Sequence, residues 1–164
     1  MFLSLQKEYE NITLDKTKVT HIKSFFKLSE ELNFNKLVFF LDRLEHHMLC
    51  LDHGKVKLEK FSDFSEGKEF CNLVSSLLEN KGFQTIDACI FSSLTKSGIS
   101  INHADKESVF LFNVFGSVIY NIYEERSHTS FLLNPGDFLL VPKSVVHAAI
   151  PLEPRIVVSV GVFD

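Results

Sequence analysis

Tryptophan is absent from this 164-residue sequence, and methionine, cysteine and proline are scarce, with two, three and four copies. The three cysteines, Cys50, Cys71 and Cys89, are odd in number and widely spaced, and no two of them form a C-x-x-C pair. They therefore predict neither a disulfide framework nor a cysteine zinc site. They are typical of reduced thiols in the cytoplasm.

Long apolar runs and an excess of positive charge are missing as well. No stretch approaches the length of a membrane span, and residues 1–8 lack the apolar core and cleavage site of a secretory signal. The net charge of −4 and the isoelectric point near 6.0 provide no basic field for nucleic acid. We therefore expect a cytoplasmic protein with no membrane partner and no nucleic-acid partner.

Apolar residues are abundant: 45% of the residues are hydrophobic, and 17 are Phe. This proportion is typical of a globular protein, and the length suits one domain with its own core. No internal repeat or linker interrupts the chain. We predict a single domain over residues 1–164, in which residues 1–82 form strands and helices that flank a core formed by residues 83–164.

One helix is indicated clearly, over residues 63–81. Asp63 can cap it, and Glu66 completes a capping box. Gly82 follows as a typical C′ residue. The apolar stripe that this helix would bury consists of Phe70, Leu73, Val74, Leu77 and Leu78. A shorter helix is expected over residues 20–32.

Most of the remaining pattern is typical of short strands separated by turn signals. Such spacing predicts a sandwich or a small barrel, and a double-stranded β-helix (jelly-roll) core with helices packed outside it fits the count. The fold class is therefore mainly β with flanking helices. The expected strands cover residues 35–41, 56–61, 85–91, 108–115, 118–123, 131–133, 137–141 and 155–163.

Two histidines and one carboxylate stand out within this pattern. His103 and Asp105 form a His-x-Asp pair at the expected end of a strand, where residues i and i+2 point to the same face. His147 follows a turn signal, an apolar run and Pro142. Two imidazoles and one carboxylate are the ligand set of the facial triad of non-haem Fe(II) oxygenases. The competing interpretation is a turn-capping Asp beside two ordinary histidines.

Taken together, these motifs resemble the cupin-fold, JmjC-like family of Fe(II)/2-oxoglutarate-dependent oxygenases. The resemblance covers roughly residues 83–164 and implies that His103, Asp105 and His147 hold Fe(II), with 2-oxoglutarate as co-substrate and O2 as oxidant. Relatives hydroxylate or demethylate protein side chains, nucleic acids and small molecules. The resemblance depends on three runs: His103-x-Asp105-x-x-x-Val109-Phe110-x-x-Asn113-x-x-Gly116, Pro135-Gly136-Asp137-x-x-x-Val141-Pro142-x-x-x-Val146-His147, and Pro154-Arg155-Ile156-Val157-Val158-Ser159.

One position departs from the family pattern. Where many relatives carry a Lys or Arg that pairs with the far carboxylate of 2-oxoglutarate, this sequence has Val118. A carboxylate buried without a partner is costly, so another group must replace it or the co-substrate differs. The best substitute is Arg155, because a guanidinium binds a carboxylate through two hydrogen bonds. Further candidates for co-substrate contacts are Ser159, Ser100, Tyr120 and Asn113.

Three functions remain open at this point. The first is a hydroxylase that uses Fe(II) and 2-oxoglutarate on a small molecule or a peptide side chain, which the short chain favours. The second is a metal cupin that ignores 2-oxoglutarate, such as an isomerase, a lyase or another dioxygenase, and Val118 favours this one. The third is a non-catalytic cupin that binds a partner. An exposed sheet edge could also pair into a homodimer.

Overall fold

The computed structural model describes residues 3–5, 12–28, 35, 49–52, 55–78, 82–94 and 100–163. Its helical elements are the 3-10 helix η3 (Phe61–Asp63) and the α-helix α2 (Ser65–Leu78). Its strands are β1 (Leu3–Leu5), β2 (Thr20–Ile22), β3 (Phe26–Leu28), β4 (Leu49–Asp52), β5 (Lys55–Leu58), β6 (Gln84–Ser93), β7 (Ser100–His103), β8 (Ser108–Phe115), β9 (Val118–Tyr123), β10 (His128–Leu133), β11 (Phe138–Val141), β12 (Val146–Pro151) and β13 (Arg155–Phe163).

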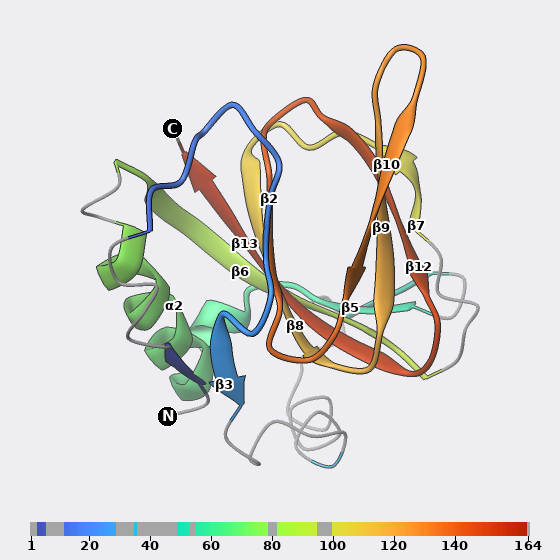
Figure 1. The fold of residues 1–164 in the computed structure, drawn as a ribbon. Helices are drawn as coiled ribbons and strands as arrows, with labels where there is room; N and C mark the ends of the chain where they lie inside the picture. The colour runs from blue at the N-terminus through green and yellow to red at the C-terminus, as the bar shows by residue number, and fades with distance from the viewer. Residues whose placement is uncertain are drawn as a thin grey trace.

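Two antiparallel sheets face each other (Figure 1). The large sheet has the order β2-β11-β8-β13-β6-β5-β4, and the small sheet has the order β10-β9-β12-β7. From β8 onward the chain alternates between the two sheets, except that β9 and β10 form a hairpin within the small sheet. This is the topology of a jelly roll. The predicted mainly β fold with a double-stranded β-helix core is confirmed.

The centre of the large sheet is buried on both faces. On β8, Phe110 and Phe112 join the cluster that includes α2, whereas Val109 and Leu111 join the cluster between the two sheets. The ring of Phe70 in α2 meets the ring of Phe112 edge-on at 5.2 Å. Burial on both faces explains why the sequence of β8 is almost continuously apolar. It also places α2 on the outer face of the large sheet, away from the small sheet (Figure 1).

Helix α2 begins two residues later than the sequence predicts. Asp63 does not cap it but lies in η3, and α2 starts at Ser65. Its predicted end at residue 81 lies outside the described residues, and the structure describes α2 as far as Leu78. Gly82 has φ +77°, and the N–H of Phe83 donates to the carbonyl oxygen of Leu78 at 3.2 Å. These two features are typical of a helix that ends in a left-handed glycine.

The predicted helix over residues 20–32 is wrong in its described part. Strand β2 pairs with β11, and β3 pairs with β1. Between them Ser24 has φ +50°, and its N–H donates to Asp137 Oδ1 at 2.8 Å. A carboxylate far along the chain therefore fixes this turn, and such a tertiary contact outweighs local pattern.

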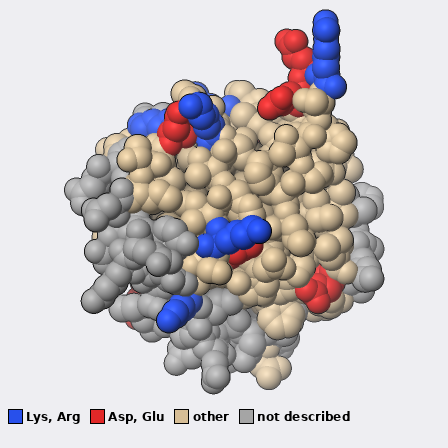
Figure 2. All heavy atoms as spheres, in the orientation of Figure 1, with Lys and Arg blue, Asp and Glu red and all other residues tan. Residues whose placement is uncertain are grey.

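Some strand boundaries also differ from the prediction. Strand β12 was not predicted, β6 and β10 are longer than predicted, and β5 ends at Leu58, before the expected boundary. The strand expected over residues 35–41 falls, apart from Asn35, outside the described residues. On the face drawn in Figure 2, the charged side chains are few and scattered among uncharged ones. Within the described residues, no helix is long and apolar enough to span a membrane.

Candidate metal centre

The pairing of β7 with β12 brings the two histidines of the motif together. His103 is the last residue of β7, and it lies directly opposite His147 in the antiparallel register. The two ring centroids are 4.3 Å apart. A register shift follows between His147 and Ala149. Cross-strand neighbours share a face of the sheet, so both imidazoles point into the space between the two sheets.

Asp105 completes the group from the loop that follows β7. Its Oδ2 lies 3.5 Å from Nε2 of His147, and its Oδ1 lies 3.9 Å from Nε2 of His103. The backbone holds this loop in place, because the N–H of Ser144 donates to the carbonyl oxygen of Asp105 at 2.9 Å. A second link joins Lys143 to the start of β8, from the N–H of Lys143 to the hydroxyl of Ser108 at 3.1 Å.

Both imidazoles are held in the orientation that a metal requires. Nδ1 of His103 lies 2.9 Å from the carbonyl oxygen of Ile101, and Nδ1 of His147 lies 3.0 Å from that of Val145. A carbonyl oxygen can only accept, so in the neutral imidazole each Nδ1 carries the proton and each Nε2 presents its lone pair. An outer partner on the second ring nitrogen is the usual arrangement of metal-bound histidine.

The residues present fit a metal ion. The ligand atoms of His103, Asp105 and His147 all lie within 4.8 Å of one another, and no other such group was found among the described residues. Ligands at 2.0–2.2 Å from an ion and at right angles to each other lie roughly 3 Å apart, so a small inward movement would complete the coordination. The set supplies two nitrogens and one carboxylate, which suits Fe(II) and leaves positions open for other ligands.

The three side chains differ in their access to solvent. The side chain of His147 is 4% exposed, whereas those of His103 and Asp105 are 44% and 34% exposed. Burial lowers the pKa of His147, and the neighbouring His103 lowers it further, although Val145 and Asp105 act in the opposite direction. A lowered pKa favours the neutral imidazole, which is the form that binds a metal.

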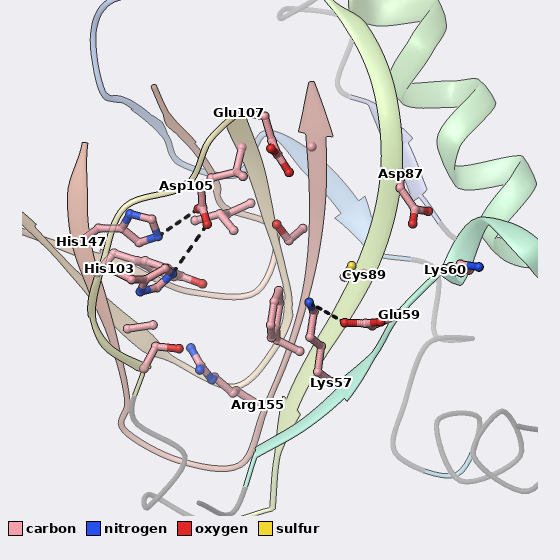
Figure 3. Close-up of a pocket in the computed structure, with 18 residues that line it drawn as sticks. Lys57, Glu59, Lys60, Asp87, Cys89, His103, Asp105, Glu107, His147 and Arg155 are labelled. Atoms are coloured by element: carbon pink, nitrogen blue, oxygen red, sulfur yellow. Dashed lines mark hydrogen bonds and ion pairs between the residues drawn. The ribbon is translucent and has the colours of Figure 1, made fainter. Parts of the chain in front are cut away.

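The triad opens into a cavity of about 430 Å³ between the two sheets (Figure 3). Small side chains on the large sheet leave this space empty. Ser159 and Gly161 of β13 and Cys89 of β6 line it, and Ala149 does so on the small sheet. A volume of this size is in the range of small-molecule sites.

Four of the five residues predicted to contact a co-substrate line this cavity together with the triad. They are Arg155 and Ser159 of β13, Ser100 of β7 and Tyr120 of β9. Arg155 is 2% exposed, and its charge acts on Tyr120. Burial raises the pKa of the Tyr120 hydroxyl, and the adjacent guanidinium lowers it.

Asn113 lies elsewhere. Its side-chain amide is buried and donates to the carbonyl oxygens of Gly116 and Leu133, at 2.7 and 3.1 Å. These bonds give Asn113 a structural role near the end of β8. Asn113 is not among the residues that line the cavity. Val118, the departure from the family pattern, is fully buried in the apolar cluster between the sheets and supplies no charge.

One wall of the cavity was not foreseen from the sequence. Lys57 lies near the end of β5, and Glu59 comes directly after this strand. Both line the cavity, together with Cys89 and Phe91 on β6. In the sequence, residues 56–61 look like an ordinary strand with one solvated face. The alternation does place Lys57 and Glu59 on a common face, but only the pairing of β5 with β6 shows that this face borders the site.

The two sheets and the inward-facing triad define a cupin fold. No protein-family model and no curated protein matches the sequence. The crystal structure of Escherichia coli ribosomal oxygenase YcfD has this fold, with a TM-score of 0.75 and 16% identity, and the match covers 100% of this chain and 54% of that chain. YcfD in complex with cobalt and 2-oxoglutarate gives a TM-score of 0.72 and 15% identity over 91% of this chain and 49% of that one.

A second kind of cupin also shares the fold. A variant of Bacillus subtilis oxalate decarboxylase matches with a TM-score of 0.50 and 16% identity, over 69% of this chain and 26% of that chain. At these identities the likeness concerns the fold. The chain spans about half the length of the YcfD chains that it matches.

Proposed function

We propose that this chain is an Fe(II)/2-oxoglutarate-dependent oxygenase that hydroxylates a small molecule or a peptide side chain. One observation carries the proposal: a His-Asp-His group with inward-facing Nε2 atoms shares a single cavity with the buried cation Arg155. A 2-oxo acid with a second carboxylate needs both features, one for each end. The resemblance of the fold to that of YcfD in complex with cobalt and 2-oxoglutarate supports the same function.

The roles of the residues follow from their positions. His103, Asp105 and His147 would hold Fe(II), which together with 2-oxoglutarate and O2 supplies the oxidation that inserts one oxygen atom into the substrate. Arg155 would bind the far carboxylate through two hydrogen bonds. The hydroxyls of Tyr120 and Ser159 line the same cavity and would donate to that carboxylate. The apolar side chains of Val109 and Leu111 would exclude water on the side of the large sheet.

The visible spectrum tests this proposal. Fe(II) and then 2-oxoglutarate are added to the purified protein without O2. We expect a weak charge-transfer band that requires both additions, because a 2-oxo acid chelates the iron through two atoms. The His103→Ala variant should lack the band. His128→Ala, which removes an exposed histidine of β10, should keep it. Iron binding without a band in the wild-type protein would contradict the proposal.

The second candidate is a metal cupin that does not use 2-oxoglutarate. The observation that favours it is Val118, which is buried and apolar where many JmjC-like relatives have a cation. This candidate predicts that iron binds to the triad with unchanged affinity whether or not 2-oxoglutarate is present. Isothermal titration with both orders of addition distinguishes the two functions.

A further inference from the structure

The cavity has a charged wall on the side away from the triad. In Figure 3, His103 and His147 lie on one side of the cavity, and Lys57, Glu59 and Cys89 lie on the other. Arg155 and the triad are assigned to the co-substrate and the metal. The wall formed by Lys57 and Glu59 is therefore available to the molecule that is oxidised.

Lys57 and Glu59 form an ordered pair. Nζ of Lys57 donates to Oε1 of Glu59 at 2.9 Å. Lys57 is the cross-strand partner of Phe91, and its Nζ lies 5.7 Å from the centre of that ring. Strand pairing and the aromatic face therefore hold the ammonium group beside the cavity. The side chains are 35% and 48% exposed, so a ligand can reach both.

Each member of the pair can accept another partner. An ammonium group has three donors and a carboxylate has about four acceptor sites, so one mutual bond saturates neither group. Asp87, another carboxylate of the wall, already accepts from the Ser62 hydroxyl at 2.6 Å and from the Ala88 N–H at 2.7 Å. Adjacent charges of opposite sign complement a ligand that carries both signs, whereas a ligand of one sign is attracted by one member and repelled by the other.

We propose that Lys57 and Glu59 are the substrate-recognition pair of this cavity, and that the substrate is a free α-amino acid. Its carboxylate binds Lys57 and its ammonium binds Glu59, which leaves the side chain directed toward the rest of the cavity. That the amino acid is the substrate rests on the proposed oxygenase function. That Lys57 and Glu59 bind it does not rest on that function. The cavity, at about 430 Å³, suits a molecule of this size.

Binding to the whole 164-residue chain without added metal tests the recognition. The twenty standard L-amino acids are screened by thermal shift in the presence of a chelator, and the best binder is titrated calorimetrically in free, N-acetylated and C-amidated form. Each blocked form should bind about tenfold more weakly, because it loses one charge-assisted contact. Omitting the metal prevents chelation by the amino acid from imitating binding at the pair.

Two variants assign each contact separately. Lys57→Met keeps the aliphatic stem and should abolish the preference for the free form over the C-amide, while the preference over the N-acetyl form persists. Glu59→Gln should do the opposite. Lys68→Met, on the exposed surface of α2, is the matched control and should change neither preference.

The possible results separate this proposal from the proposed function. The recognition pair is refuted if no free amino acid binds, if blocked forms bind equally well, or if both variants keep both preferences. It is also refuted if Lys57→Met weakens 2-oxoglutarate binding to the Co(II)-loaded protein and leaves amino-acid binding intact. Amino-acid binding that follows the predicted pattern, without 2-oxoglutarate consumption after iron is added, would uphold the pair and reject the oxygenase.

Discussion

His103 lies directly opposite His147 where β7 and β12 pair, and the two rings are 4.3 Å apart at their centres. The candidate metal centre therefore depends on strand register. A shift of one residue would turn every side chain of β7 to the other face of the sheet, and the two imidazoles would no longer meet.

A metal ion should stabilise the folded chain, because the unfolded chain does not hold the three ligands together. At a free concentration of 100 times its Kd, Co(II) should add about 2.7 kcal/mol to the free energy of unfolding. For a chain of this length the gain corresponds to an increase in Tm of about 5–10 °C, measured by differential scanning calorimetry. Asp105→Ala should abolish the increase and His128→Ala should retain it. An equal increase in Tm in both variants would show that the ion binds outside the triad.

Arg155 should determine the choice between oxo acids. 2-Oxobutyrate keeps the chelating end of 2-oxoglutarate but lacks the far carboxylate, so the Co(II)-loaded protein should bind it at least about tenfold more weakly. Arg155→Met should remove this difference. Arg155→Lys keeps a positive charge in the buried site, so it should perturb the fold less than Arg155→Met. It should reduce the difference in affinity between the two acids without removing it. Calorimetric titration of both acids gives the values, and an unchanged ratio in Arg155→Met would exclude Arg155 as the anchor.

Two left-handed glycines should respond very differently to alanine. A Cβ on Gly116 would lie 2.0 Å from the carbonyl oxygen of Pro154. Among the described residues, a Cβ on Gly82 would meet the Lys16 side chain, at 3.5 Å. Gly82→Ala should lower the free energy of unfolding by about 1–2 kcal/mol through backbone strain alone. Gly116→Ala should cost clearly more, because the segment before Arg155 must move. Urea unfolding of both variants measures the difference, and equal costs would contradict the clash.

Asp137 should be a strong contributor to stability. Its carboxylate accepts the N–H groups of Ser24 and Asn134, at 2.8 and 2.9 Å, and its side chain is 5% exposed. Asp137→Asn replaces one acceptor oxygen with a donor that faces an N–H, and it should cost about 1–3 kcal/mol of unfolding free energy. Asp63→Asn, at an exposed position, should cost much less. Chemical denaturation compares them, and similar small losses would show that the turn does not depend on this carboxylate.

The jelly-roll core could be predicted because each of its strands has a recognisable local sequence pattern. Strands β8, β9 and β13 each match their predicted ranges, since alternating or continuous apolar runs between turn residues leave few other structures open. The sequence also placed His103, Asp105 and His147 in one group. Strand alternation relates the first two, and the turn, the strand and Pro142 before His147 suggested the third.

Other features depend on contacts that a local pattern does not contain. The helix expected over residues 20–32 does not form in its described part, because pairing with β11 and the bond from Ser24 to Asp137 impose a turn and strands. The wall formed by Lys57 and Glu59 was missed for a similar reason. From the sequence alone, a charged residue on a strand is expected to face solvent. Only the position of the neighbouring strand shows that Lys57 and Glu59 border a cavity.

The bonds from His103 and His147 to the carbonyl oxygens of Ile101 and Val145 have a consequence for mutational robustness. Neither acceptor belongs to a side chain, so no point substitution can delete it, and any residue at position 101 or 145 that keeps the strand course supplies the same oxygen. The hydrogen bonds that orient the two imidazoles therefore depend on no particular neighbouring side chain. The sequence around the two histidines and the aspartate can change widely while these hydrogen bonds are kept.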